Sequence, residues 1–455
     1  MAAVDPRRRE LLRRAFLGVG AWGASRLLPG CRVGGHDAGP SGTVADATHC
    51  RSEVLEGEGA ARVDGGPFDG AAGEAHIIAA PDPSGGSLED DAGALEPRRL
   101  EIPSLLPPDE HGVQVPPGFG ARVVACSGER VAPGSDYVWH GAPDGGATFA
   151  LSDGGWIYVS NSELVGAGGV GALVFGPAGD VRAAYPILEG TERNCAGGAT
   201  PWGTWISCEE VPLGRCFQCD PLGRRPAEAL PALGVFRHEA VAVDVDNHHV
   251  YLTEDQPDGR LYRFTAAGEM EPGVLDLREG LLEVLRVSDP DTGDATWAPV
   301  PDPTAMTAPT RLQVDGSQPF AGGEGIWLHR GVVFFTTKLD NRVWALELQE
   351  QRLSILYDAA RYDTPTLTGV DNITMSPSGH LLVCEDEGNM ELALLDAQGD
   401  PHVLLRILDQ AGSELCGPAF DSTGTRLYFS SQRGQRNGQL GITYELSGPF
   451  EALAI

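Results

Sequence analysis

The chain has 455 residues, a formal net charge of −31 and an apolar fraction of 42%. Such acidity excludes nucleic acid and anionic membrane surfaces as binding partners, because both repel a strongly negative protein. The 61 glycines and 34 prolines indicate many turns, and therefore favour short strands over long helices.

Residues 1–31 resemble an export signal. The run RRAFL at 13–17 has the form of a twin-arginine motif, and the apolar stretch that follows it is too short to span a bilayer. The run LLPGC at 27–31 has the form of a lipoprotein processing site with Cys31 as the lipidated residue. We therefore expect export by the twin-arginine route to the periplasm or the cell surface. The one membrane contact that we expect is a lipid on Cys31.

Residues 32–100 have the composition of a tether. Gly, Ala, Asp, Ser and Pro dominate this stretch and aromatic residues are few, so it cannot form a core. We expect a disordered linker here and a single folded domain over residues 101–455.

A strand–turn–strand pattern repeats through the folded part. The second strand of each repeat ends on a polar residue; these endpoints are Glu163, Glu209, Glu254, Lys338, Glu385 and Gln432. The repeat length is about 46 residues, which is typical of a propeller blade. It doubles once, between 254 and 338, which indicates an insertion at about 268–318 with one helix near 275–285. The pattern predicts an all-β, six-bladed β-propeller; a pair of β-sandwiches is the competing architecture.

The endpoints also indicate a site, since equivalent positions in a propeller converge on its axis. Four of them are carboxylates, and clustered carboxylates repel one another unless a cation lies among them. Oxygen ligands suit Ca²⁺, whereas a thiolate such as Cys195 suits iron, zinc or copper. The alternative is that these are turn residues at exposed strand ends.

The nine cysteines leave several roles open. Cys216 and Cys219 have the spacing of a zinc pair, but no second pair follows, so a local disulfide or two free thiols is expected. Besides binding a metal, Cys195 could form a disulfide with Cys208, act as a nucleophile with His238, or be inert.

The run NCAGGATPWGTWISCEE at 194–210 closely resembles a signature of the PhoX-type alkaline phosphatases. Four weaker segments agree with it: HEAVAVD at 238–244, YLTEDQPDGRLYRF at 251–264, DNITMSPSGHLLVCED at 371–386 and SELCGPAFDSTGTRLYFSSQ at 413–432. Members of this family are twin-arginine-exported six-bladed propellers with an iron–calcium cluster. The resemblance spans roughly residues 141–432.

The resemblance implies roles for individual residues. Cys195 would ligate Fe³⁺ together with Glu210, Glu239 and Glu324. The implied Ca²⁺ ligands come from Glu209, Glu254, Asp255, Asp371, Asn372, Glu385 and Glu414. Trp202 would shape the turn near Cys195 and wall the pocket.

Two positions depart from the family pattern. Ser162 replaces a histidine, and Gly322 stands where relatives often have an arginine that can clamp phosphate. We expect Lys338 or Arg342 to supply the positive charge instead, which places both among the candidate catalytic residues.

The resemblance implies an exported metal-dependent phosphatase that hydrolyses small-molecule phosphomonoesters. We expect the protein to be a monomer. Two alternatives remain from the residues alone. One is a calcium-dependent propeller lactonase or esterase, in which Cys195 would have no role. The other is a non-catalytic calcium-binding surface propeller, which the changes at Ser162 and Gly322 favour.

Overall fold

The structure is a computed structural model that describes residues 76–77, 100–434 and 440–453. The expected export signal, with Cys31, lies outside the described residues, as does nearly all of the expected linker. Among the described residues, no helix combines the length and the apolar character that crossing a bilayer requires.

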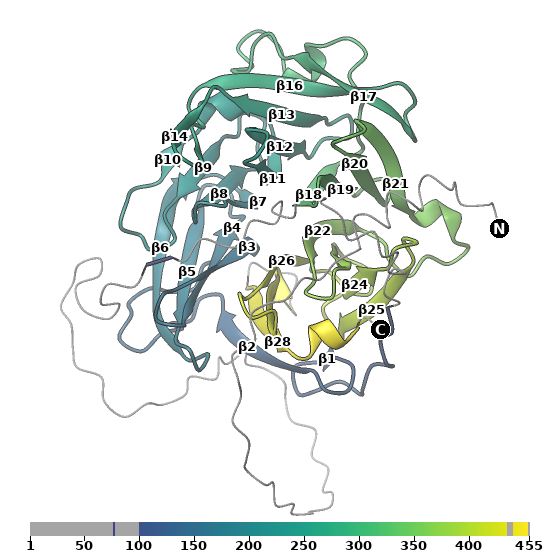
Figure 1. Cartoon of the computed structure of the whole chain (residues 1–455). Coiled ribbons are helices and arrows are strands. Elements are labelled where there is room, and N and C mark those ends of the chain that lie inside the picture. The colour runs from purple at the N-terminus through teal and green to yellow at the C-terminus, as the bar shows by residue number, and fades with distance from the viewer. Residues whose placement is uncertain (1–75, 78–99, 435–439, 454–455) are drawn as a thin grey trace, which may run out of the picture.

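Six antiparallel four-stranded units, here called blades I to VI, surround a central axis (Figure 1). Blade I consists of β3 (Pro143–Ala150), β4 (Trp156–Ser162), β5 (Gly168–Phe175) and β6 (Val181–Thr191). Blade II consists of β7 (Asn194–Ala199), β8 (Trp205–Glu209), β9 (Cys216–Cys219) and β10 (Glu228–Ala229). Blade III consists of β11 (His238–Asp244), β12 (His249–Glu254), β13 (Leu261–Ala266) and β16 (Gly280–Val287).

The second half of the chain forms the other three blades. Blade IV consists of β18 (Gly323–His329), β19 (Val332–Thr337), β20 (Arg342–Glu347) and β21 (Arg352–Asp358). Blade V consists of β22 (Val370–Met375), β23 (Leu381–Glu385), β24 (Glu391–Leu395) and β25 (Pro401–Ile407), with β1 (Val113–Gln114) at its outer edge. Blade VI consists of β26 (Leu415–Phe420), β27 (Arg426–Ser431), β28 (Ile442–Ser447) and β2 (Gly120–Cys126).

The blades form a closed ring. The innermost strands, β3, β7, β11, β18, β22 and β26, each contact the next one, and β26 contacts β3. In blade VI, β2 pairs with β28, so strands from the two ends of the described chain complete one sheet. This arrangement confirms the all-β propeller that the repeat predicted. Blades III and IV are not separate sheets. The strand β17 (Gly293–Pro299) pairs with the outer strand of each and joins them into one nine-stranded sheet.

The prediction of a helix near 275–285 is wrong. This segment instead contains the short strand β15 (Val274–Leu275), which pairs with β14 (Glu269–Glu271), and most of β16. Leu282 and Val284 pack between blades II and III, whereas Leu285 packs between blades III and IV. Side chains that point alternately to the two faces of a strand explain the spacing of these leucines and valines as well as a helix does. The strand forms because β16 pairs with the otherwise free edge of β13. Part of the expected insertion is therefore the outer strand of blade III, β16.

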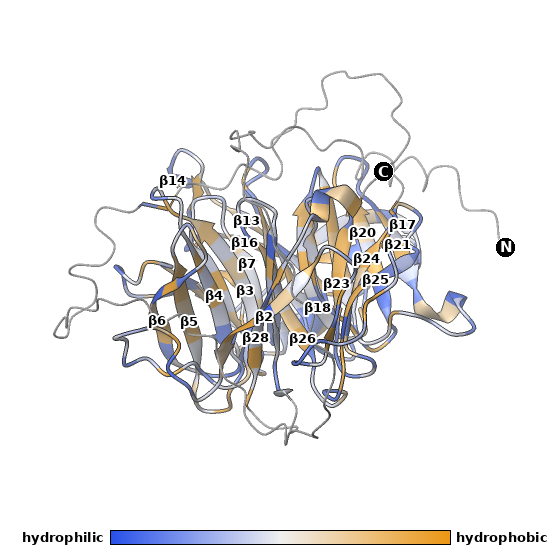
Figure 2. Ribbon diagram, turned by 90° about the horizontal axis from the view of Figure 1, so that it is seen from below, coloured by the Kyte–Doolittle hydropathy of each residue, from blue (hydrophilic) through white to orange (hydrophobic). Residues whose placement is uncertain are grey.

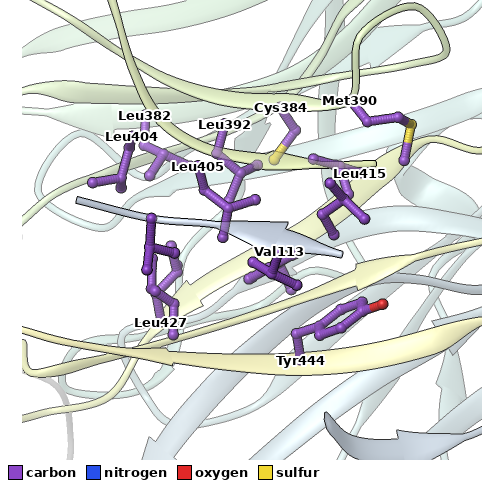
Figure 3. Packing of buried hydrophobic residues seen from close by; sticks show 14 of the residues in the cluster. Val113, Leu382, Cys384, Met390, Leu392, Leu404, Leu405, Leu415, Leu427 and Tyr444 are labelled. Atoms are coloured by element: carbon purple, nitrogen blue, oxygen red, sulfur yellow. The ribbon is translucent and has the colours of Figure 1, made fainter. Parts of the chain in front are cut away.

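The hydrophobic core is divided among the interfaces between neighbouring blades. Figure 2 shows the apolar residues concentrated along the strands. Figure 3 shows the cluster between blades V and VI, where Leu382 and Leu392 of blade V face Leu415 and Leu427 of blade VI. Each blade thus buries its faces only against its neighbours, as a propeller requires. The described 3-10 helices lie in connections and near the chain end: η1 (Pro231–Leu233), η2 (Thr310–Leu312), η3 (Ala359–Arg361) and η5 (Phe450–Leu453).

The cysteines of blade II do not form the local disulfide that their spacing suggested. Cys216 and Cys219 are both free, because the two residues lie three apart on β9 and face opposite sides of the sheet. Cys216 packs against blade III, and Cys219 packs against blade I. Cys195 and Cys208 are also free, which excludes a disulfide between them in this structure.

Candidate metal centre

The second residue of each innermost strand forms an inner set around the axis. These six equivalent residues are Asp144, Cys195, Glu239, Glu324, Asp371 and Cys416. In every blade the pairing register shifts next to this residue, as β-bulges do where they redirect a side chain. The same local irregularity in all six blades therefore presents the inner set.

A second set comes from the residue that directly follows the second strand of each blade. These residues are Glu163, Glu210, Asp255, Lys338, Asp386 and Gln432. Each blade thus contributes two side chains at the same end of the ring, one from each of its two inner strands.

Ligand atoms from both sets, together with Glu414, form five overlapping groups whose atoms lie within 4.8 Å of one another. The groups are Asp144 with Glu163 and Cys195; Cys195 with Glu210 and Glu239; Glu239 with Glu324 and Asp371; Asp371 with Asp386 and Glu414; and Asp144 with Glu414 and Cys416. Because neighbouring groups share members, they form one continuous cluster that involves all six blades.

Cys195 links two of these groups. Its Sγ lies 3.3 Å from Glu239 Oε1 and 3.6 Å from Asp144 Oδ2. Asn161 Nδ2 donates to the Cys195 carbonyl at 3.0 Å, which fixes the start of β7 against blade I. The two blades approach so closely here that a Cβ on Gly145 would lie 2.4 Å from Ala196 Cα. The thiol is therefore held among carboxylates by the backbone on both sides.

The acids of the cluster are strongly perturbed. Burial raises the pKa of Glu210 to about 9, and the neighbouring Glu163 adds to this shift. Burial raises the pKa of Asp371 to about 7, although Lys338 opposes the shift. Burial, and next the charge of Asp144, also hold the pKa of the Cys195 thiol well above its usual range. Such shifts disappear when a cation stabilises the charged forms.

Three buried carboxylate oxygens of the described centre have no hydrogen bond: Glu239 Oε2, and also Glu324 Oε1 and Asp386 Oδ1, which lie near Lys338 and Arg433. Glu239 Oε2 is buried without a hydrogen bond, although a carboxylate oxygen in a protein interior is normally satisfied. The donor set around it combines one thiol with several carboxylates. Carboxylates fit a hard cation such as Ca²⁺, and the thiolate of Cys195 fits a softer transition metal. The described residues therefore fit a mixed metal centre.

Four cationic side chains lie among these acids. Arg193 contacts Glu163 and also donates to Glu210 at 2.9 Å, and Arg237 donates to Glu210 at 2.7 Å. On the opposite side of the ring, Lys338 Nζ lies 2.9 Å from Glu324 Oε1 and 3.2 Å from Asp386 Oδ2. Arg433 lies 3.1 Å from Glu414. The cations are the more exposed partners: the Lys338 side chain is 29% exposed, compared with 2% for Glu324.

The structure brings together many of the residues singled out from the sequence. Those within the five groups are Cys195, Glu210, Glu239, Glu324, Asp371 and Glu414. Asn372 lies beside them, since its Nδ2 donates to Asp371 Oδ1 at 2.9 Å. Asp255 is close enough to Glu210 and Glu324 to raise their pKa values, but its oxygens are not part of a group. Lys338 contacts the cluster directly.

Three glutamates expected at the metals lie elsewhere, because they occupy the last position of a second strand. Glu209 accepts the backbone N–H groups of residues 192 and 215, and Glu385 accepts those of residues 368 and 391. Glu254 accepts from Tyr262 Oη at 2.9 Å and pairs with Arg311. In each blade the following residue faces the cluster instead, since successive strand residues point to opposite sides.

Two more expected residues lie away from the cluster. Arg342 pairs with Asp291, Asp340 and Asp358, outside the five groups. Trp202 lies in the β7–β8 turn, at the far end of β7 from Cys195. There it lines a separate cavity of about 310 Å³ with Ile77 and Asp220, so it does not wall the metal centre.

Several residues of the cluster were missed by sequence reasoning. The missed candidate ligands are Asp144, Asp386 and Cys416. Glu163 was noted as the polar end of a repeat, but not as a metal ligand. The missed cations are Arg193, Arg237 and Arg433. Aligning the repeats on the first strand would have indicated Asp144 and Cys416. No sequence signal marks the arginines, which lie in or beside the loops between strands.

The neighbours Glu385 and Asp386 provide a test of this register. We expect Glu385→Gln to keep the bound metal and to lower the free energy of unfolding by about 1–3 kcal/mol, because it weakens two charge-assisted hydrogen bonds. Asp386→Asn should instead lower the metal content, with a smaller change in the stability of the metal-free protein. Elemental analysis and urea denaturation of the two variants measure both effects. If Glu385→Gln lost the metal and Asp386→Asn kept it, the finding that Asp386, and not Glu385, faces the cluster would be contradicted.

Comparisons with known proteins bear on this centre. The sequence model of the family described as alkaline phosphatase PhoX matches residues 145–224 and 214–342. These ranges include Cys195, Glu210, Glu239 and Glu324, and the match confirms the resemblance found in the sequence. None of the curated proteins matches the chain significantly.

Two solved structures with low TM-scores illustrate the similarity to known structures. A protein of unknown function from Bacteroides thetaiotaomicron has a TM-score of 0.47 and 9% identity, with 72% of this chain and 76% of that chain covered. A gluconolactonase from Xanthomonas campestris has a TM-score of 0.40 and 14% identity, with 77% and 100% covered. At these TM-scores, neither carries an argument about this chain.

Proposed function

We propose that this chain, whose residues 145–342 match the sequence model of the PhoX alkaline phosphatase family, is a metal-dependent phosphatase that hydrolyses small-molecule phosphomonoesters. The observation that carries the proposal is the position of Cys195 between Asp144 and Glu239, within a cluster of buried acids. A lactonase with one buried calcium ion would give this thiol no role. A structural calcium site would likewise not need a thiol at its centre.

We assign the two kinds of metal to the two sides of the cluster. Cys195 with Glu210 and Glu239 would hold Fe³⁺, because this group combines one thiol with two carboxylates. The side without Cys195 would hold Ca²⁺ through oxygen ligands. Its proposed ligands are Glu324, Asp371, Asp386 and Glu414, with Asn372 and Asp255 beside them. When bound, the ions would neutralise phosphate oxygens and activate the attacking nucleophile.

The protein's own cations would bind and orient the phosphate. Lys338 is the strongest candidate, because its ammonium group contacts acids of two different groups and is partly exposed. Arg193 and Arg433, each 34% exposed, lie over other acids of the same cluster. Once metals compensate these acids, the cationic groups would be available to a phosphate dianion.

Lys338 would also replace the arginine that relatives often have at position 322. Gly322 has a positive φ of 72°, and a Cβ there would lie 3.2 Å from Leu339 Cγ and 3.3 Å from Asp255 Oδ1. The Lys338 N–H donates to the Gly322 carbonyl at 2.8 Å, so the two positions adjoin. A long side chain at 322 is thus disfavoured, and the positive charge comes from the next strand.

We also propose that the protein is exported by the twin-arginine route, on the strength of RRAFL at 13–17, and anchored by a lipid on Cys31. The monomeric state remains part of this proposal.

The test of the proposed function combines metal analysis with turnover. We expect the natively exported protein to contain stoichiometric iron and calcium, and to hydrolyse p-nitrophenyl phosphate until calcium is chelated. Restoring Ca²⁺ should restore turnover. Metals without turnover would remove the phosphatase assignment but keep the centre, and protein without iron would remove the role given to Cys195.

A further inference from the structure

Two free thiols face each other across the β8–β9 hairpin of blade II. Cys208 and Cys216 are direct partners in the antiparallel pairing, and their Sγ atoms lie 3.7 Å apart. The next pair is hydrogen-bonded, since the Glu209 N–H donates to the Arg215 carbonyl at 3.0 Å. Because hydrogen-bonded and non-hydrogen-bonded pairs alternate, Cys208 and Cys216 form a non-hydrogen-bonded pair.

This backbone arrangement suits a disulfide. In non-hydrogen-bonded pairs the Cα atoms are about 4.5 Å apart and the side chains are closest, which is within the range that disulfides span. A bond could therefore form by side-chain rotation alone, without movement of either strand. Cys219, on the other face of β9, has no such partner: its Sγ contacts only the Phe217 carbonyl, at 3.7 Å, among its described hydrogen bonds.

The surroundings hold one of the two sulfur atoms in place. His238 Nε2 lies 3.1 Å from the Gly234 carbonyl, which can only accept, so Nε2 carries the proton. His238 Nδ1 is therefore an acceptor, and it lies 3.3 Å from Cys216 Sγ. Both thiols are fully buried between blades II and III, so their neighbours restrict where the sulfur atoms can move.

The hairpin that the two thiols would bridge carries part of the metal centre. Glu210 lies in the connection between Cys208 and Cys216, and it accepts hydrogen bonds from Arg193 and Arg237. A covalent bond at the base of this connection would restrain the position of Glu210. It would also remove freedom from the unfolded chain, which is the usual source of disulfide stabilisation.

We propose that Cys208 and Cys216 are a modification site that forms an intramolecular disulfide by exchange with a disulfide oxidant, before the packing of blade II against blade III buries both thiols. One cysteine sulfur attacks the oxidant, forms a mixed disulfide and releases the first oxidant thiol. The other cysteine then displaces the second oxidant thiol and closes the Cys208–Cys216 bond. The two cysteines lose two electrons and two protons, and the oxidant disulfide becomes two thiols.

The test is a thiol map of the full chain. The full chain is unfolded with its thiols reduced and then refolded with glutathione disulfide, or with a phosphine reductant as the reference; it is then alkylated under denaturing conditions, digested and analysed by mass spectrometry. We expect Cys208 and Cys216 to be linked after oxidation and alkylated after reduction. The link should persist in Cys219→Ser and disappear in Cys208→Ser. We also expect the oxidised form to have a Tm about 5 °C above that of the reduced form.

The wild-type map alone decides the proposal if a variant fails to fold. Alkylation of both Cys208 and Cys216 after oxidation would overturn it, and so would a link from either residue to Cys219. The map does not depend on phosphatase activity, so its outcome is separate from that of the proposed function.

Discussion

Cys195→Ser is expected to lower kcat/KM for p-nitrophenyl phosphate by at least about 100-fold, since changes that only touch a metal ligand already cost 10–100-fold. The substitution removes the one thiol that contacts both Asp144 and Glu239. Serine is close to cysteine in size, so the packing around Asn161 and Ala196 should survive. The loss should therefore accompany a loss of iron and not a loss of fold. Iron content, kcat/KM and Tm of the same preparation measure these effects together.

Cys219→Ser is the matched control for this variant. Cys219 is also a free cysteine of blade II, but it is buried between blades I and II and belongs to none of the groups of the metal centre. We expect this variant to keep its iron and its turnover. If Cys195→Ser retained both iron and turnover, the proposed centre would have to be abandoned.

Removal of the metals should destabilise the protein, and more strongly at higher pH. In the metal-free protein the pKa of Asp371 is raised to about 7 and that of Glu210 to about 9. A folded-state pKa above the unfolded value means that folding favours the protonated form. This contribution is complete below the unfolded pKa, at about pH 4, and is lost as the pH rises through 7 to 9. Bound cations favour the charged forms instead and should counteract the loss.

At pH 8 we expect chelation to lower the Tm by about 5–10 °C. This is the size of effect expected when a ligand that binds only the folded protein, and is present far above its Kd, is removed. At pH 5 the decrease should be much smaller. Thermal unfolding of metal-loaded and chelated protein at both pH values measures the difference. A decrease that is equal at the two pH values, or larger at pH 5, would show that these acids do not control the stability of the metal-free protein.

The fold could be predicted because a propeller repeats its sequence pattern. Each blade buries its faces against its neighbours, so each must supply alternating apolar strands and turns at nearly the same interval. The one wrong element, the helix near 275–285, lies where that interval doubles. There the sequence offered apolar spacing that a helix and a strand explain equally well, and pairing with the free edge of β13 decided in favour of a strand.

The sequence was sufficient to predict which kinds of ligand form the centre, but not which of two neighbouring acids at a strand end faces the axis. Pairs such as Glu209 with Glu210, and Glu385 with Asp386, offer two carboxylates at one strand end. Only one member of each pair can face the axis, and a shift of one residue exchanges them. The sequence does not reveal that shift, because the bulges that set it depend on packing between blades.

Ring closure has a consequence for how this protein gains its activity during biosynthesis. The cluster contains Asp144 from blade I and both Glu414 and Cys416 from the blade VI side, and blade VI is completed only when β2 pairs with β28. A growing or truncated chain that lacks β28 leaves blade VI without one of its strands and exposes both edges of the gap. The calcium side of the proposed centre would therefore act as a check on completion, because Glu414 joins Asp371 and Asp386 only where blade VI closes the ring.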